Sequence, residues 1–342
     1  MTELKESAIF SFYDFGIQVK SSDPQTVDNI RRDFSFFVDT KISPEVNFEI
    51  FTTSPEYNSF PTLRPSSHSP RNFSYRNGNL LFIDYFGKGL LIVDSIKKEY
   101  KIFSAEPHLR HEIAFLTILS LVGQNLDSRH IHRVHGLGLE INGKGTLILL
   151  PQGGGKTTLM LELLKHPNVK LISEDTPLIN SSGEILPFPI RIGIDADAKL
   201  PDLPEKHLRL IERMEFKPKY LLDIDYFKDK ITKNPCKLEF AFEGIRCLGN
   251  DSRIIPTPKS KMLRAFLINS VIGVGVYQGI EFLIQNSPLE LIKKSSLLAS
   301  RLRNSCQVVL KAKTYSFLTG SDKKKNTETF INFFNQIPPK DS

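Results

Sequence analysis

A glycine-rich segment between an apolar run and a helical pattern constrains the fold of this chain more than any other feature. The segment PQGGGKTT at 151–158 follows the apolar run TLILL at 146–150 and leads into apolar residues at helical spacing over 157–165. Glycines suit such a strand-to-helix turn because a Cβ would block the turn or the approach of phosphate oxygens. The start of the helix offers backbone N–H groups and a favourable dipole to an anion. The segment therefore predicts a phosphate-binding loop in an α/β fold.

The segment departs from the pattern G-x-x-x-x-G-K-[ST] at one position. Leu150 stands where the first glycine is expected, whereas Gly155, Lys156 and Thr157 fill the last three positions. The lysine is expected to reach the β- and γ-phosphates, and the threonine hydroxyl to bind Mg²⁺. The alternative is an ordinary glycine-rich turn with an incidental lysine. The residues expected to contact the nucleotide are Gln152, Gly153, Gly154, Gly155, Lys156, Thr157 and Thr158.

Two adjacent acids follow the next predicted strand. Glu174 and Asp175 come just after the strand predicted over 169–172, and this strand is expected to run parallel to the one before the loop. Ligands of open α/β sheets bind at the carboxyl ends of strands, so the carboxylates should lie beside the loop. One acid can hold Mg²⁺ together with Thr157, and the other can accept a proton from an attacking hydroxyl. The alternative is that one acid merely caps the turn before Pro177.

The chain is expected to form two domains. Residues 1–105 show short runs in which apolar and polar residues alternate, which predicts a smaller β-rich domain without a chemical motif. Within it, Asp23 and Pro24 are expected to open a short helix over residues 24–38. Residues 106–342 contain the glycine loop and form the second domain.

A long helix is expected over residues 107–126, where a proline opens a run of apolar residues at helical spacing. His108, His111 and Glu112 lie near its start but lack the i, i+4 histidine spacing of H-E-x-x-H. We therefore expect them to be exposed polar side chains rather than metal ligands.

The remaining elements follow from the same periodicities. Asn142-Gly143 predicts a hairpin turn, Thr327 is the expected cap of the last helix, and residues 195–215 suggest a helix pair or a mobile insertion. Strands are expected at 134–141, 145–150, 169–172, 238–242, 308–312 and 314–318, and helices at 157–165, 259–270, 288–303 and 325–336.

Composition excludes several classes of protein. The 45 Lys and Arg residues exceed the 38 acidic ones, giving +7, but they are dispersed and lack a recognition helix or RNA-binding motif, so nucleic acid is not an expected partner. The 3 cysteines form no C-x-x-C pair, which argues against a zinc ribbon or a disulfide framework and favours a reduced, cytoplasmic compartment. No signal peptide or apolar stretch of about 18 residues is present, so we expect no membrane partner.

Four motifs in order resemble the C-terminal catalytic domain of HPr kinase/phosphorylase and, still more, the broad group of HPr-kinase-like proteins. These are VHG at 134–136, the hairpin with its glycine turn, GGGKT at 153–157 and LISED at 171–175. The segment ILPFPIRIGI at 185–194 is similar to the proline-rich segment of that group. The resemblance covers about residues 130–195.

The resemblance implies an α/β fold (α+β overall) with a phosphoenolpyruvate-carboxykinase-type P-loop kinase domain. It also implies ATP or another nucleoside phosphate, Mg²⁺, and phosphorylation of a hydroxyl group. His135 matches the family's histidine near the phosphates, and Lys156 and Thr157 match the loop lysine and the metal-binding hydroxyl. Glu174 and Asp175 match the paired aspartates, one a metal ligand and one the general base, and we assign the base to Asp175.

The chain also departs from this family. A glutamate at 174 replaces an aspartate, and the Arg-Gly signature that follows in true HPr kinases is absent, so HPr is not expected as the acceptor. We expect a kinase that phosphorylates a serine of a protein or peptide, or a small molecule. The alternative is a non-catalytic nucleotide-binding regulatory module with a degenerate loop. The sequence leaves the acceptor and a homo-oligomeric state open.

Overall fold

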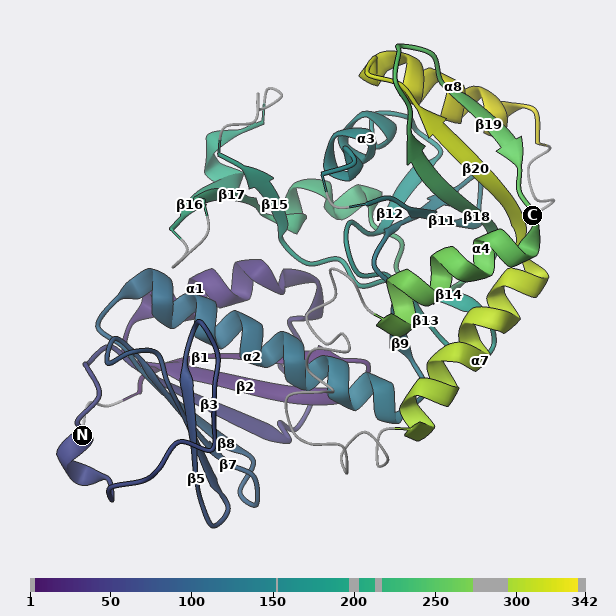
Figure 1. Cartoon of the computed structure of the whole chain (residues 1–342). Helices are drawn as coiled ribbons and strands as arrows, with labels where there is room; N and C mark the ends of the chain where they lie inside the picture. Colours follow the sequence, from purple (N-terminus) through teal and green to yellow (C-terminus); the bar gives the residue numbers. More distant parts are fainter. Residues whose placement is uncertain (1–3, 152, 197–202, 213–216, 273–294, 338–342) are drawn as a thin grey trace. The chain divides into compact units, whose positions relative to one another are not determined.

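The computed structural model describes residues 4–151, 153–196, 203–212, 217–272 and 295–337 (Figure 1). Contacts within the chain divide it into two compact units. The first comprises Met1–Val122 and Ile190–Tyr226, and the second comprises Gly123–Pro189 and Phe227–Ser342. The first unit thus contains the predicted N-terminal β-rich segment together with a later part of the chain. The predicted domain boundary at residue 105 stays a prediction.

An eight-stranded sheet forms most of the first unit, in the order β1-β2-β3-β8-β7-β6-β5-β4. Its strands are β1 Glu6–Phe12, β2 Phe15–Ser21, β3 Val46–Phe51, β4 Ser67–His68, β5 Phe73–Asn77, β6 Leu80–Asp84, β7 Leu90–Asp94 and β8 Glu99–Phe103. Alternating residues are buried, with Phe10, Phe12 and Phe48 fully inaccessible. The prediction that residues 1–105 are rich in β-strands is therefore confirmed.

Two helices belong to this sheet. Helix α1 (Pro24–Asp33) contacts β1 and β2, and the carboxylate of Asp23 caps it by accepting from the backbone N–H groups of its first turn. Helix α2 (Pro107–Ser128) begins at the predicted proline. Both helices are confirmed, although α1 ends five residues early and gives way to a 3₁₀ turn at Ser35–Phe37. Further 3₁₀ helices lie at Tyr57–Ser59, Glu205–His207 and Ile224–Lys230.

Residues 190–226 contribute a small antiparallel sheet to the first unit. Its strands are β15 (Ile192–Asp195), β17 (Lys219–Leu222) and β16 (Leu208–Ile211), in that order. The prediction of a helix pair over 195–215 is wrong for the described part, because β16 lies there; residues 197–202 and 213–215 lie outside the described residues. The strand was missed because β16 has only four residues, too few for its period to stand out among the charged residues around it.

A buried carboxylate links this small sheet to the two helices. Asp33 at the end of α1 is fully buried and accepts hydrogen bonds of 2.8 Å from Arg191 and from Arg209. Nε2 of His111 in α2 lies 2.6 Å from the same carboxylate. Burial raises the pKa of Asp33, but Arg191, His111 and Arg209 outweigh burial and hold this pKa well below its usual range. The cluster keeps a carboxylate ionised inside the unit.

The expectation that His108, His111 and Glu112 are all exposed is correct only for His108. His111 is 5% exposed, and burial lowers its pKa. Glu112 accepts a 2.6 Å hydrogen bond from Arg71, with its side chain 13% exposed. Both partners lie far away in sequence, so helical spacing alone could not reveal them.

The second unit is built on a sheet in the order β12-β10-β11-β18-β14-β13-β9, with β20 beside β18 and β19 beside β20. Its strands are β9 His132–Arg133, β10 Leu137–Ile141, β11 Lys144–Leu149, β12 Val169–Ser173, β13 Leu178–Ile179, β14 Glu184–Leu186, β18 Cys236–Arg246, β19 Arg253–Pro256 and β20 Lys313–Thr319. Strands β11, β18 and β20 run parallel to one another. The architecture is mixed α/β, which agrees with the predicted fold class.

Helices cover both faces of this sheet (Figure 1). Side chains of α4 (Lys259–Phe266) and α7 (Ser295–Lys311) share one apolar cluster with β11 and β18. On the other face, α8 (Lys323–Asn335) packs Phe330 and Phe334 on Phe242 of β18 and contacts α3 (Lys156–Leu163). A π-helix at Leu267–Ile272 follows α4. The parallel strands are therefore buried on both sides, as their apolar sequences require.

Several predicted boundaries need correction. Residues 308–312 do not form a strand, because α7 continues to Lys311 and packs its valines into the apolar cluster. Asp322, rather than Thr327, caps α8 through its side chain. The strand predicted over 134–141 begins at Leu137. The hairpin turn is confirmed, since Asn142 and Gly143 both have positive φ.

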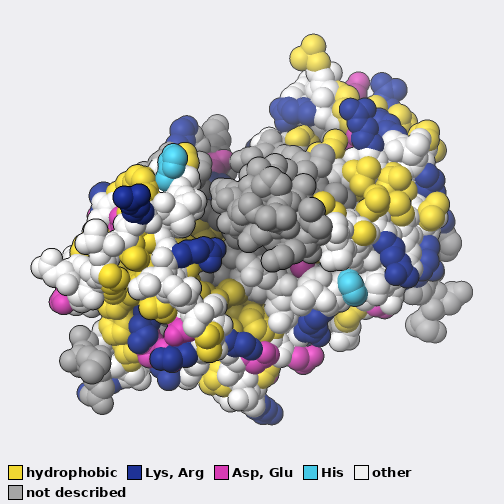
Figure 2. Space-filling view, turned by 60° about the horizontal axis from the view of Figure 1, so that its bottom comes forward, with side chains coloured by type: hydrophobic (Ala, Val, Ile, Leu, Met, Phe, Trp, Pro, Cys, Tyr) yellow, Lys and Arg dark blue, Asp and Glu magenta, His cyan; other side chains and the backbone are white. Residues whose placement is uncertain are grey.

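None of the helices in the described ranges combines the length and apolar character needed to cross a bilayer. On the face that Figure 2 shows, Lys and Arg side chains lie in separated groups among hydrophobic and acidic ones.

Replacing Asp33 by Asn should lower the free energy of unfolding by about 3–5 kcal/mol at pH 7, because it leaves buried cations without their counter-charge. Asp28→Asn is the matched control, since its 3.5 Å pair with Arg31 is exposed and should cost about 0.5 kcal/mol or less. Urea unfolding monitored by circular dichroism measures both changes.

The pH dependence of this difference has a defined sign. The folded pKa of Asp33 is depressed, so its contribution is present above the unfolded value of about 3.9 and is lost as pH falls below that value. Equal unfolding free energies for Asp33→Asn and Asp28→Asn at pH 7 would contradict the assignment.

Candidate functional site

The glycine loop has the conformation that a phosphate-binding turn requires. Gly153 and Gly155 have φ of +72° and +84°, in the left-handed region, and Gly155 is the N-cap of α3. The N–H of Gly154 donates to the carbonyl of Pro151 at 2.9 Å, and a Cβ at 154 would come within 2.8 Å of that oxygen. The first N–H groups of α3 have no acceptor within the helix. The predicted Gln152 lies outside the described residues.

Leu150 has a defined place at the start of the loop. Its side chain is only 2% exposed. A Cβ built on Gly244 of β18 would come within 2.1 Å of Leu150 Cδ2, so the leucine occupies space that only a glycine at 244 leaves open. A packed apolar side chain therefore occupies the position where the loop pattern expects glycine. The neighbouring strand β18 leaves room for it, because Gly244 has no side chain.

Lys156 brings the loop and the acidic strand end together. Its ammonium donates to Oδ1 of Asp175 at 2.5 Å and to Nε2 of His135 at 3.2 Å. The lysine is 9% exposed, whereas the side chain of Asp175 is 41% exposed. A lysine held at a carboxylate and an imidazole provides a positive centre at the mouth of the loop.

His135 is neutral and oriented in this arrangement. Burial lowers its pKa, and Lys156 lowers this pKa further, while Asp175 acts in the opposite direction. An ammonium only donates, so Nε2 accepts and the ring proton resides on Nδ1, which lies 3.3 Å from Asp175 Oδ1. The backbone N–H of His135 donates to Asn269, and that of Gly136 donates to Asp175. These long-range bonds explain why β10 begins only after residue 136.

Thr157 makes the second link to the strand end. Its hydroxyl donates to Oε1 of Glu174 at 2.6 Å. Strand β12, which ends just before Glu174, and strand β11 both pair antiparallel with β10, so they run in the same direction as predicted. Parallel directions bring the acids and the loop to one edge of the sheet.

The structure brings together five of the predicted residues: His135, Lys156, Thr157, Glu174 and Asp175. Thr158 lies on the opposite side of the loop, in a pocket. The catalytic, nucleotide-binding and metal-binding roles of these residues stay predictions.

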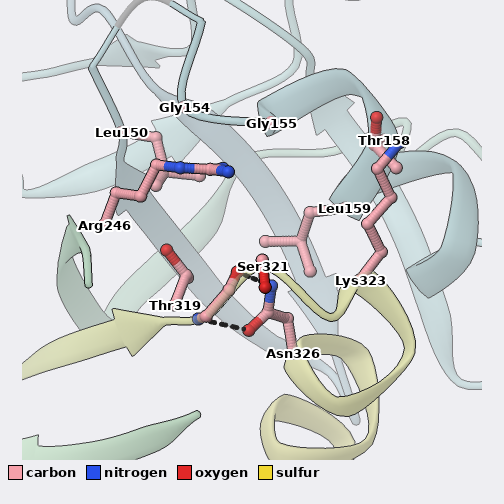
Figure 3. Close-up of a pocket in the computed structure, with 11 residues that line it drawn as sticks. Leu150, Gly154, Gly155, Thr158, Leu159, Arg246, Thr319, Ser321, Lys323 and Asn326 are labelled. Atoms are coloured by element: carbon pink, nitrogen blue, oxygen red, sulfur yellow. Dashed lines mark hydrogen bonds between the residues drawn. The ribbon is translucent and has the colours of Figure 1, made fainter. Parts of the chain in front are cut away.

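Sequence reasoning missed the pocket around Thr158, which Figure 3 shows. It is lined by Leu150, Gly154, Gly155, Thr158, Leu159, Arg246, Thr319, Gly320, Ser321, Lys323 and Asn326. Arg246 and Thr319 end β18 and β20. Gly320 and Ser321 belong to the turn between β20 and α8, and Lys323 and Asn326 lie in α8. These positions lie about 90 to 170 residues from the loop and form no motif, so only folding brings them beside it.

A second polar cluster contains the Asp–His–Ser contacts of a hydrolase triad but, within the described residues, lacks an oxyanion hole. Nδ1 of His132 lies 2.8 Å from Asp127, and its Nε2 lies 2.8 Å from the hydroxyl of Ser300. Ser300 lies inside α7, whose backbone N–H groups are bonded within the helix and cannot form an oxyanion hole. Arg301 also donates to Asp127 at 2.8 Å. The cluster joins α7 to the end of α2 and provides no acyl-transfer site.

Oxygen ligands suited to magnesium occur at the loop. Among the described residues, no group of three or more His, Cys, Asp or Glu side chains is placed to hold a metal ion. Mg²⁺ beside phosphates needs only one or two protein oxygens, because phosphates and water complete its shell. The hydroxyl of Thr157 and the carboxylate of Glu174 are a hard-oxygen pair of this kind.

Comparisons with known proteins add little to this geometry. No family model and no curated protein matches the chain. Among solved structures, the HPr(Ser) kinase/phosphatase from Coxiella burnetii is similar, with 17% identity and a TM-score of 0.19. The match covers 33% of this chain and 65% of that protein, which is less than two thirds of its length. A likeness of this size supports no conclusion about activity.

Replacing Lys156 by Ala should raise the pKa of His135, because it removes a neighbouring positive charge and admits water to the ring. In the unchanged protein the midpoint should lie below the ordinary value of about 6.5, with the neutral ring protonated on Nδ1. NMR titration of the imidazole measures both properties. Lys165→Ala is the control, since Lys165 is exposed just beyond α3 and pairs with Glu162. A midpoint unchanged by Lys156→Ala would contradict the coupling.

Proposed function

We propose that this chain is a magnesium-dependent kinase that transfers the γ-phosphoryl group of a nucleoside triphosphate to a hydroxyl acceptor. One observation carries the proposal: each of the two acids after β12 contacts a different side chain of the glycine loop. Asp175 lies 2.5 Å from the ammonium of Lys156, and Glu174 lies 2.6 Å from the hydroxyl of Thr157. A nucleotide switch needs only one acid at this edge, whereas transfer to an alcohol uses a metal-binding oxygen and a base.

The proposed roles follow from these contacts. The N–H groups of the loop and the first turn of α3 bind the β- and γ-phosphates, and Lys156 stabilises the charge on the transferring group. Thr157 and Glu174 would hold Mg²⁺, which draws negative charge from the phosphate oxygens when bound. Neutral His135 keeps the lysine in place through Nε2.

Asp175 is the proposed base. Its side chain is 41% exposed and therefore accessible to an acceptor. When phosphates bind Lys156, the Asp175 oxygen that accepted from this ammonium becomes free to accept from the incoming hydroxyl. The hydroxyl proton passes to Asp175, the acceptor oxygen bonds to the γ-phosphorus, and the nucleoside diphosphate leaves with the electrons of the broken P–O bond. A serine of a protein or peptide and a small-molecule alcohol both meet this requirement.

The arrangement of β11, the loop, α3 and β12 also underlies our proposal that the second unit has a phosphoenolpyruvate-carboxykinase-type P-loop fold. The glycine conformations and the two loop-to-acid contacts support it. Strand β10 lies between β11 and β12, so the acids reach the loop from a strand that does not adjoin it.

A regulatory nucleotide-binding module is the second candidate. The 2.5 Å contact between Lys156 and Asp175 favours it, because a carboxylate that stays paired with an ammonium is a poor base. In such a module the pair would persist with nucleotide bound, and no phosphoryl transfer would occur.

Two substitutions separate the candidates. With ATP labelled in its γ-phosphate and candidate acceptors from a cell extract, Asp175→Asn should lower transfer at least about 100-fold while ATP binding remains. Lys156→Ala should lower it by about the same factor and weaken binding as well. Asp251→Asn, an exposed acid of the same unit, is the control and should leave transfer unchanged. Binding without transfer by the unchanged protein would favour the module, and full turnover by Asp175→Asn would exclude this residue as the base.

A further inference from the structure

The pocket beside Thr158 lies on the side of the loop that faces away from the two acids. Along the sheet, β12 precedes β10 and β11, whereas β18 and β20 lie beyond β11. The acids follow β12, and Arg246 and Thr319 end β18 and β20. A nucleoside triphosphate carries its γ-phosphate at one end and its nucleoside at the other. With the γ-phosphate at Lys156 and Asp175, the nucleoside end would extend toward this pocket.

The pocket has an apolar floor and a polar rim. Leu150 and Leu159 are 2% and 7% exposed and form the floor. Figure 3 shows the Arg246 side chain extending alongside Leu150, and the Lys323 side chain reaching up to Thr158. This arrangement suits a nucleoside, because an apolar surface can pack against the flat base and the cations can lie beside the phosphate attached to the ribose.

Two polar side chains that line the pocket already have partners. The amide of Asn326 accepts from the N–H of Gly320 at 2.9 Å and donates to its carbonyl at 3.0 Å. The hydroxyl of Ser321 bonds to Gly249 and Asn250. These bonds occupy part of the hydrogen-bonding capacity of Asn326 and Ser321, so we expect packing and charge to contribute most to recognition. Adenosine and guanosine triphosphates should then bind with affinities within about 5-fold of each other.

We propose that Leu150 forms the floor of a nucleoside subsite, so that the residue which breaks the loop pattern serves nucleotide binding. This inference rests on the proposed nucleotide-dependent function. The leucine is accommodated because Gly244 has no side chain, and it places apolar surface beside the phosphate site. The start of the loop therefore contributes to affinity for the nucleoside, while the glycines and Lys156 contact the phosphates.

The test compares ATP with inorganic tripolyphosphate, which has the phosphates but no nucleoside. Both are titrated with Mg²⁺ into the full chain by isothermal calorimetry. Leu150→Ala should weaken ATP binding about 10-fold and change tripolyphosphate binding less than about 2-fold. Restoring the pattern with Leu150→Gly should weaken ATP binding at least as much. Circular dichroism checks that each variant is folded.

A second variant avoids the buried position. Ser321 is exposed at the rim, so Ser321→Phe should fill the pocket without unfolding the chain and should weaken ATP binding about 10-fold or more. Ser321→Ala removes the same hydroxyl but leaves the pocket open, and it should bind ATP like the unchanged protein. Tripolyphosphate binding should be the same in all three proteins.

The outcomes distinguish the subsite from the proposed function. The subsite is overturned if both ligands bind in a Lys156-dependent way but neither Ser321→Phe nor a folded Leu150→Ala changes the affinity for ATP. That result leaves the kinase proposal standing. Failure of the unchanged protein to bind either ligand through Lys156 overturns both.

Discussion

The contact between the buried ammonium of Lys156 and the carboxylate of Asp175 is the interaction on which the candidate site depends. It joins the start of α3 to the end of β12, which lies two strands away in the sheet from β11, and it positions His135 from a third segment. A lysine at 9% exposure is costly to bury unless its charge is paired, and Asp175 provides the opposite charge. A ligand that brings phosphates to the loop would compete with Asp175 for the same ammonium.

The start of the loop shows how a motif can lose a residue without losing its conformation. The glycines at 153 and 155 occupy left-handed backbone, where a side chain is strained, whereas position 150 lies at the end of a buried strand with no such requirement. A leucine is tolerated there because Gly244 supplies the space. The loss of stability on replacing a motif residue therefore depends on the backbone conformation at that position and on the neighbouring side chains. The presence of the residue in the sequence pattern does not determine it.

Charge burial also organises the first unit. Asp33 sits among Arg191, Arg209 and His111, and this cluster attaches a segment that lies more than 150 residues later in sequence to helices α1 and α2. Removing one member would leave the others desolvated and unpaired, so the cluster specifies which segments belong together. This cluster is one reason that residues 190–226 belong to the first unit, although they lie between two parts of the second unit in sequence.

The sequence by itself determined the local elements of the site. Strand β11, the glycine turn, α3, β12 and the adjacent acids follow from periodicity and glycine placement over some 30 residues, because short-range backbone preferences decide such elements. Only the tertiary structure decided the buried state of His111, the helical state of residues 308–311, the small sheet of residues 190–226 and the pocket around Thr158. Each of these depends on partners distant in sequence: Asp33 for His111 and for the small sheet, the apolar face of β18 for α7, and Arg246 and Lys323 for the pocket. Local sequence patterns do not indicate which distant side chain will contact a given residue, since packing and charge pairing form only when the whole chain folds.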